Sequence, residues 1–132
     1  MQTSALRRKT FLLGLALLFG CNSQQLPTRQ TIVGTITMDG EPISKGSVHF
    51  SSAQDVAEGT ETFVDIIDGE YRAKVTLGKK RVSIRGLKET RPGGPDMPPD
   101  YIDVVPGKFN VKSQLEANVT EDAERFDFEL KS

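Results

Sequence analysis

The sequence predicts an all-β fold, a seven-stranded antiparallel β-sandwich that follows a cleaved signal peptide. Apolar and polar residues alternate with a period of two in seven short segments, and Gly or Asp-Gly pairs separate several of them. No segment after residue 20 shows the 3.6-residue apolar stripe of a helix. Buried parallel strands would be continuously apolar and separated by helices, so the alternation indicates antiparallel strands packed in two layers. With 132 residues, 36% of them apolar, the chain suffices for one core.

Residues 1–20 have the layout of a secretory signal peptide. A basic cluster at residues 7–9 precedes an almost wholly apolar run at 11–18, and Gly20 then precedes the only cysteine, Cys21. The apolar run is too short for a membrane-spanning helix, which needs roughly 20 residues. We therefore expect export and cleavage, with residues 21–30 as a flexible tether and residues 31–132 as the folded domain.

The order Leu18-Phe19-Gly20-Cys21 resembles the lipobox of bacterial lipoproteins. The resemblance implies that the Cys21 sulfur receives diacylglycerol, that cleavage follows Gly20, and that acyl chains hold the mature protein to a membrane. Each buried methylene contributes about 0.8 kcal/mol, so two or three chains anchor almost permanently. Asn22 stands where such lipoproteins often carry Asp to remain on the inner membrane, which implies an outer-membrane location facing the periplasm or the cell surface.

The first four predicted strands lie between residues 31 and 76. The third of them spans residues 62–67. The inward apolar positions of the other three are Ile32, Gly34 and Ile36 in the first strand, Val48 and Phe50 in the second, and Tyr71, Ala73 and Val75 in the fourth. Asp39-Gly40 ends the first strand in a turn. Asp68-Gly69 predicts a tight hairpin between the third and fourth strands, because an Asp-Gly pair tolerates positive φ.

The last three predicted strands follow a break at Gly78. Their inward positions are Val82 and Ile84 in the fifth strand, Leu115, Ala117 and Val119 in the sixth, and Phe126, Phe128 and Leu130 in the seventh. Between the fifth and sixth strands, residues 87–113 form one long connection that contains five of the seven prolines. Connections beyond about 12–15 residues are often functional.

Three motifs in the first half of the domain are typical of one family. Val33-Gly34-Thr35-Ile36, Asp39-Gly40-Glu41-Pro42-Ile43 and Lys45-Gly46-Ser47-Val48-His49-Phe50 resemble the opening of carboxypeptidase-regulatory-like, transthyretin-like modules, which commonly read G-x-V-x-x-D-G-x-P-x-x-G-x-V-x-F. Ile67-Asp68-Gly69-Glu70-Tyr71 is similar to their central hairpin, and residues 105–110 and 126–130 resemble the ending of small bacterial lipoproteins of this type. The resemblance covers nearly all of residues 31–130 and implies a Greek-key, prealbumin-like sandwich that is a binding or structural unit.

The residue inventory excludes several chemistries. One cysteine and one histidine, His49, allow neither an internal disulfide nor a zinc site built from such ligands. Asp96, Asp100 and Asp103 match no calcium-binding loop. Transthyretin-like hydroxyisourate hydrolases carry several active-site histidines and a Tyr-Arg-Gly-Ser terminus, which this chain lacks. We therefore expect a protein without catalysis, metal, cofactor or small-molecule substrate.

Charge separates the remaining classes of partner. Removal of residues 1–20 leaves 14 basic against 18 acidic residues, a net charge near −4 that argues against nucleic acid. Eight of the fourteen basic residues gather between residues 72 and 91, namely Arg72, Lys74, Lys79, Lys80, Arg81, Arg85, Lys88 and Arg91. If the fourth and fifth strands pair, Arg72, Lys74, Arg81 and Arg85 share the outer face, where facing like charges need a nearby anion. Two sources of negative charge are open. One is an external anion, namely an anionic polysaccharide, a lipid headgroup or an acidic protein. The other is the chain itself, where Asp127 and Glu129, or solvent, balance the positive charges.

The proline-rich connection has two interpretations. It presents Arg91, Met97, Tyr101 and Phe109 to a partner, or it packs Tyr101, Ile102 and Phe109 over the open end of the sandwich.

The expected function is that of a non-enzymatic, lipid-anchored module of the cell envelope with a structural or interaction role, whose partner is an envelope protein or polysaccharide. The alternative is a carbohydrate- or anionic-polymer-binding module that uses the basic face or the proline-rich loop, and a transthyretin-like hydrolase ranks last. The candidate partner-binding residues are Arg72, Lys74, Arg81, Arg85, Arg91 and Tyr101.

Overall fold

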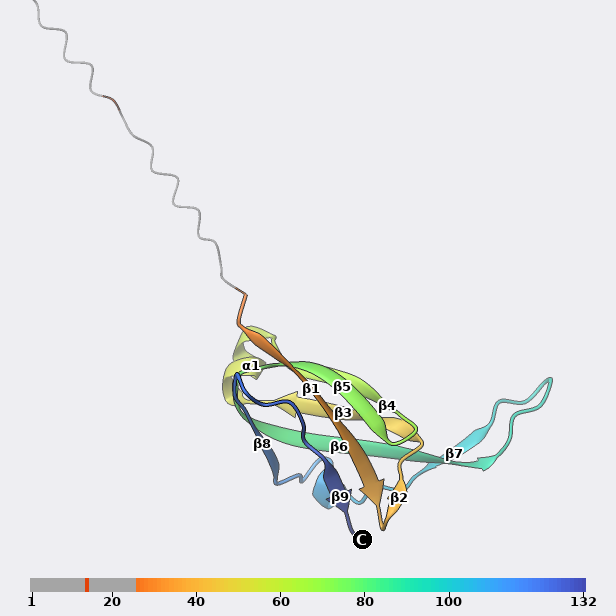
Figure 1. The fold of residues 1–132 in the computed structure, drawn as a ribbon. Coiled ribbons are helices and arrows are strands. Elements are labelled where there is room, and N and C mark those ends of the chain that lie inside the picture. The colour runs from red at the N-terminus through yellow and green to blue at the C-terminus, as the bar shows by residue number, and fades with distance from the viewer. Residues whose placement is uncertain (1–13, 15–25) are drawn as a thin grey trace, which may run out of the picture.

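The computed structural model describes Gly14 and residues 26–132 and confirms an all-β fold, with 56% strand and 8% helix. An antiparallel sheet curls into a half-barrel (Figure 1). Its elements in chain order are β1 (Arg29–Met38), β2 (Glu41–Pro42), β3 (Lys45–Ser51), α1 (Ala53–Glu58), β4 (Thr62–Ile67), β5 (Glu70–Thr76), β6 (Gly78–Arg91), β7 (Asp100–Asp103), the 3-10 turn η1 (Gly107–Phe109), β8 (Leu115–Val119) and β9 (Phe128–Leu130).

The strands follow the order β2-β1-β5-β4-β3-β6-β7, with β8 also paired to β6 and β9 parallel to β1. Ile67 and Glu70 form the only backbone pair between β4 and β5 in the described residues. The Asp68-Gly69 hairpin is therefore confirmed, but its strands diverge at once, and β5 pairs with β1 while β4 pairs with β3. This divergence lets the curled sheet present two walls, β1-β5-β9 and β4-β3-β6-β8, to a shared core.

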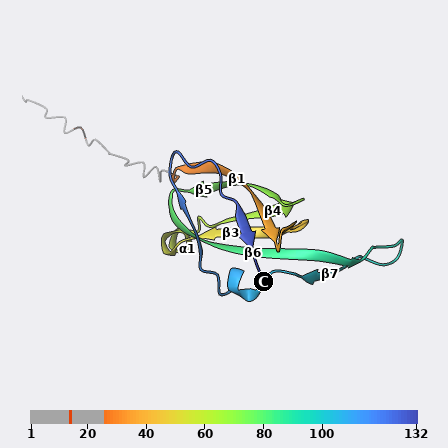
Figure 2. The same ribbon diagram turned by 60° about the horizontal axis from the view of Figure 1, so that its bottom comes forward.

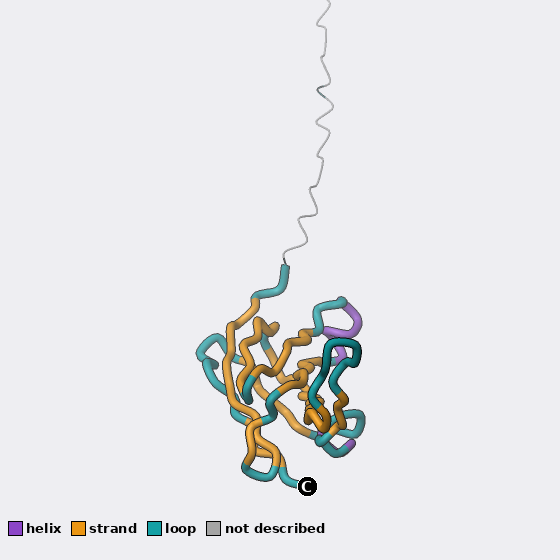
Figure 3. Tube along the Cα trace, turned by 90° about the vertical axis from the view of Figure 1, so that its right-hand side faces the viewer, coloured by secondary structure: helices purple, strands orange, loops and turns teal. Residues whose placement is uncertain are grey.

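The core confirms the predicted inward positions. Its buried apolar side chains are Ile32, Ile36, Ile43, Val48, Phe50, Ile66, Tyr71, Ala73, Val75, Val82, Ile84, Val105, Ala117, Val119, Phe128 and Leu130. Leu115 and Phe126 are partly buried against it. Figure 3 shows strands around most of the body, with the helical turns at its periphery. Each large side chain in such a core contributes roughly 1.5–3 kcal/mol through removal from water, so alternate-position burial accounts for the sheet.

The structure differs from the sequence prediction in its number of strands. Nine strands are present in the described residues, not seven, because β2 and β7 are additional. β1 begins at Arg29, inside the predicted tether, and β9 begins at Phe128 instead of 126. A six-residue helix, α1, also forms where we predicted none; it is shorter than two turns, too short for an apolar stripe to appear. Ser52 caps its first turn, and Gly59 ends it in the left-handed region, with φ of 68°.

The long connection predicted at residues 87–113 is largely a β-hairpin. β6 continues to Arg91, and β7 returns beside it, so the pair forms an arm that extends beyond the body (Figures 1 and 2). Tyr101 and Ile102 are 37% and 51% exposed, so they do not cover the core as one interpretation required. Only the following segment does so, through the buried Val105 and the partly buried Phe109. Residues 88–103 are hereafter the arm.

A close backbone approach joins the C-terminal segment to β1. The amide of Val33 donates to the carbonyl of Glu124, and the amide of Phe126 donates to the carbonyl of Val33, each at 3.0 Å. The Tyr71 hydroxyl donates to the Phe126 carbonyl at 2.6 Å, and burial raises the pKa of this phenol above its ordinary value. Gly34 permits the approach, because a Cβ there would lie 1.8 Å from the Phe126 oxygen.

Candidate functional site

The six predicted partner-binding residues lie in three separate places. Arg72 and Lys74 are on β5, Arg81 and Arg85 are on β6, and Arg91 and Tyr101 belong to the arm. The predicted cationic face depended on pairing between the fourth and fifth predicted strands. That pairing does not form, since β4 and β3 lie between β5 and β6. The predicted face with four facing cations is therefore not formed.

Asp127, which was expected to balance the charge of these cations, contacts other residues. The Asp127 carboxylate lies 2.9 Å from Nε of Arg125 and accepts the Thr35 amide at 2.8 Å. These contacts hold the pKa of Asp127 below its ordinary value, with the Arg125 hydrogen bond as the main cause. Asp127 thus fastens the C-terminal segment to β1 and forms no ion pair with the cations of β5 or β6.

Two candidate residues of the arm contact neighbouring side chains. Nη2 of Arg91 lies 2.8 Å from the Asp100 carboxylate, a partner on the opposite strand of the same hairpin. Nζ of Lys45 lies 4.8 Å from the centre of the Tyr101 ring, which links the base of the arm to β3. Arg91 and Tyr101 are exposed, but they lie apart from Arg81 and Arg85.

A cleft of about 480 Å³ lies on the outer face of β3, β4 and β6. Strand register places Phe63, His49 and Ser83 in one row across this face and Asp65, Ser47 and Arg85 in the next. Residues that follow η1 close one side. The cleft is lined by Ser47, His49, Phe63, Arg81, Ser83, Arg85, Asn110 and Val111.

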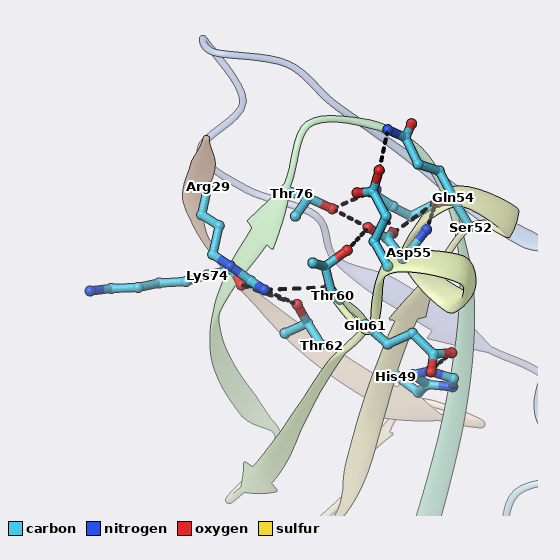
Figure 4. Close-up of polar contacts among 12 residues, drawn as sticks. Arg29, His49, Ser52, Gln54, Asp55, Thr60, Glu61, Thr62, Lys74 and Thr76 are labelled. Atoms are coloured by element: carbon cyan, nitrogen blue, oxygen red, sulfur yellow. Dashed lines mark hydrogen bonds and ion pairs between the residues drawn. The ribbon is translucent and has the colours of Figure 1, made fainter. Parts of the chain in front are cut away.

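An aromatic stack forms one wall of this cleft. The rings of His49 and Phe63 are 3.9 Å apart between centres and inclined by 5°. Nε2 of His49 lies 3.0 Å from the Glu61 carboxylate, which orients the imidazole (Figure 4). Phe63 remains 67% exposed. The sequence analysis did not identify Phe63 as a surface residue. The alternation of β4 does contain the signal, because Phe63 faces the side of the strand opposite to Thr62, Val64 and Ile66.

The two arginines of the cleft have different roles. Arg81 donates through Nε to the Ser113 carbonyl at 2.9 Å and through Nη2 to the Val111 carbonyl at 2.8 Å, which holds the loop after η1 against β6. Arg85 is exposed, and within residues 26–132 no carboxylate forms an ion pair with it. Arg85 is therefore the cation of this cleft that is open to an external anion.

A second polar cluster, absent from the sequence prediction, is buried at the corner between β5 and β6 (Figure 4). Asp55 and Lys80 are each only 3% exposed. Nζ of Lys80 lies 2.6 Å from an oxygen of the Asp55 carboxylate. Lys80 was expected in the basic surface group, so its burial corrects that prediction. We call Asp55, Lys80, Thr76, Thr60 and Ser52 the buried cluster.

Every oxygen of Asp55 has partners inside the buried cluster. One carboxylate oxygen accepts from the hydroxyls of Thr60 at 2.8 Å and Thr76 at 2.7 Å, and the other accepts from Ser52 at 2.9 Å and from Lys80. Lys80 also donates to Thr76 at 2.6 Å. Burial raises the pKa of Asp55, but the hydrogen bonds from Lys80 and the three hydroxyls outweigh it and hold the pKa far below its ordinary value.

The buried cluster joins elements that are distant in the sequence. A cavity of about 250 Å³ beside it is lined in part by Pro27, Thr28 and Leu77. Nζ of Lys80 donates to both Asp55 and Thr76, so its hydrogen bonds are made inside the cluster. The ion pair connects α1 to the start of β6, two elements 25 residues apart.

The pKa of Asp55 predicts a pH dependence of stability. A folded-state pKa below the unfolded value of about 3.9 adds stability that is complete above that value and is lost as pH falls toward the folded pKa. We expect the free energy of unfolding in urea to fall more between pH 5 and pH 2 in the natural protein than in Asp55→Asn. Asp39 and Asp127, whose pKa values are also lowered, titrate in both proteins and cancel in the comparison. Equal slopes for the two proteins would contradict the assignment.

Several predictions fall outside the described residues or concern sites not seen within them. Cys21 and the basic and apolar segments before it lie outside the described part of the chain. Within the part that is described, no three His, Cys, Asp or Glu side chains gather as a metal site, and no helix has the length and apolar character to cross a membrane.

Comparison with known proteins gives no assignment. The chain matches no protein-family model, no curated protein and no solved structure.

Proposed function

We propose that this chain is a non-enzymatic, lipid-anchored module of the cell envelope that binds a partner through its folded domain. The observation that carries the proposal is the order of a basic cluster, an apolar run, Gly20 and Cys21, in which a lone thiol is available for acylation. β1 begins at Arg29, so the folded domain starts eight residues after that thiol. At about 3.3 Å per residue, the intervening chain would hold the domain within roughly 26 Å of its anchor.

The fold supports the finer part of the proposal, a transthyretin-like Greek-key module. The two walls of the curled sheet, the hairpin at Asp68-Gly69 and the buried alternate residues of β1 and β3 all fit such a module. The resemblance of residues 31–130 to carboxypeptidase-regulatory-like domains supports the same proposal. Because the core fills the space between the walls, a partner of this domain would bind at its loops or outer faces.

Lipid attachment is tested by the mass of the mature N-terminus. When the full gene is expressed in a bacterium, we expect the purified protein to begin at Cys21 and to carry diacylglycerol on sulfur, with the protein in the membrane fraction. Cys21→Ser removes the only thiol and is expected to move the protein out of that fraction, because no acyl chain remains to be buried. A natural protein that retains residues 1–20 and carries no acyl group would overturn the anchor.

A carbohydrate- or anionic-polymer-binding role is the second candidate, and the outer-face cleft favours it. Phe63 supplies an exposed ring, and Arg85 supplies a cation without a carboxylate partner in the described residues. The chain has no tryptophan on which a sugar could stack, but an exposed phenylalanine ring offers the same kind of apolar face. The cleft carries this candidate because it combines an exposed aromatic ring with an open cation.

A further inference from the structure

We infer that the outer-face cleft binds a carboxylated sugar unit of an anionic glycan, with the sugar against the His49–Phe63 stack and its carboxylate on Arg85. The inference rests on the proposed binding role of the domain and does not require the lipid anchor. Four features define the class of ligand. They are the volume of the cleft, its aromatic wall, the serine hydroxyls on its floor and the open cation Arg85.

Two contacts position the wall of the cleft in the absence of a ligand. Phe63 on β4 covers one face of the His49 imidazole, so the other face is directed toward β6 and the cleft. The hydrogen bond to Glu61 fixes the rotation of this ring. A pyranose presents C–H bonds on its flat faces, and these pack favourably against the π-face of an aromatic ring. A wall that does not need to be ordered loses less entropy on binding.

The floor and the cation complete a site for a carboxylated ring. Ser47 and Ser83 lie in neighbouring rows on the floor, where their hydroxyls can donate to or accept from sugar hydroxyls. Arg85 lies opposite Ser47, in the row next to His49. Its planar guanidinium binds a carboxylate through two parallel hydrogen bonds. A sugar against His49 would therefore place a carboxylate substituent within reach of Arg85.

Charges around the cleft select against a densely charged polymer. Asp65 lies in the same row as Ser47 and Arg85, and Glu61 contacts His49 at the wall. These carboxylates repel additional anionic groups, so one negative charge per sugar fits better than several. The cleft volume of about 480 Å³ lies within the usual range for small-ligand sites, about 300–1,000 Å³.

The test is calorimetric titration of the full chain in detergent micelles with trigalacturonate as the probe. The fully methyl-esterified trisaccharide keeps the sugar and removes the charge, and dextran sulfate presents sulfate groups at high density in place of carboxylates. We expect binding of trigalacturonate, with affinity for the ester lower by about tenfold or more, because charge-assisted hydrogen bonds are lost. We expect dextran sulfate to bind less tightly per site and to lose its binding in moderate salt.

Three variants assign the binding to the cleft. Arg85→Gln is expected to weaken trigalacturonate binding by about tenfold or more, and Phe63→Ala by about fivefold. Arg72→Gln is the matched control, because Arg72 is also an exposed strand arginine but lies on β5, outside the cleft. We expect it to change affinity by less than about twofold. Unchanged thermal unfolding of each variant shows that the fold is retained.

Three results would overturn the inference: no trigalacturonate binding at millimolar concentration, equal weakening by Arg72→Gln and Arg85→Gln, or tighter binding of dextran sulfate than of trigalacturonate. These failures are distinguishable from failure of the anchor. A protein without acyl groups on Cys21 that still binds trigalacturonate through Arg85 would overturn only the anchor, and an acylated protein without such binding would overturn only the glycan site.

Discussion

Replacement of Lys80 by methionine is expected to lower the free energy of unfolding by about 3–5 kcal/mol. The substitution keeps most of the side-chain volume but leaves the Asp55 carboxylate buried without its cationic partner. Thr60, Thr76 and Ser52 still donate to that carboxylate, yet neutral hydroxyls do not replace the ammonium charge. Urea unfolding followed by far-ultraviolet circular dichroism at pH 7 measures the loss.

The neighbouring residue provides the matched control for this experiment. Lys79 has a side chain that is 70% exposed and pairs with Glu116 at 3.2 Å, so Lys79→Met is expected to change stability by less than about 1 kcal/mol. The double variant Asp55→Asn with Lys80→Met removes both charges and is expected to be less destabilised than the sum of its single variants. A Lys80→Met protein as stable as Lys79→Met would show that the buried ion pair contributes nothing net.

Replacement of Gly34 by alanine is expected to destabilise the fold by about 3 kcal/mol. The new Cβ would lie 1.8 Å from the backbone oxygen of Phe126, and no side-chain rotation relieves a contact with backbone. The segment around Phe126 must move away from β1, which strains its hydrogen bonds to Val33 and Tyr71. We expect a lower melting temperature and faster amide hydrogen exchange at Phe126.

Gly94 is the control for the loss of a glycine. A Cβ at Gly94 meets no atom within 4 Å, so Gly94→Ala at the tip of the arm is expected to change stability by less than about 0.5 kcal/mol. If Gly34→Ala and Gly94→Ala unfold alike, the approach of Phe126 to β1 is not a determinant of stability.

The period of two in the sequence was sufficient to predict the all-β class and the core. Ile32, Ile36, Val48 and Phe50 are buried as their alternation required. Such residues are determined by local geometry, because successive side chains of a strand point to opposite faces whichever strand lies beside it. The predicted turn at Asp68-Gly69 formed for the same local reason, as Asp68 and Gly69 both adopt positive φ.

Strand partners were less predictable, since they depend on residues far away in sequence. Only Leu77 separates β5 from β6, yet the two strands belong to different walls of the sheet. Because β5 and β6 do not pair, the predicted cationic face does not form. The extension of β6 into the arm was hidden because the polar residues 88–91 have no buried face to create an alternating pattern.

In both candidate sites, the alternation of the strand indicated the burial or exposure of a residue whose type suggested the opposite. Lys80 is in phase with Val82 and Ile84, so alternation alone places it inward, but lysine is usually solvated. Its partner Asp55 lies in a helix too short to recognise. Phe63 shows the converse, an aromatic residue in phase with the exposed Asp65. In both cases the period was the better guide than hydrophobicity.

The parallel pairing of β9 with β1 has a consequence for biosynthesis. Ile36 faces Phe128 in that register, and Phe128 and Leu130 are both buried in the core. A ribosome that adds about 5–20 residues per second needs roughly 5–20 s to make the intervening residues. During that time the first strand has no neighbour on this side, and the Phe126 contact that covers Gly34 does not exist. The wall of β1, β5 and β9 is therefore completed only when the last residues of the chain have been made.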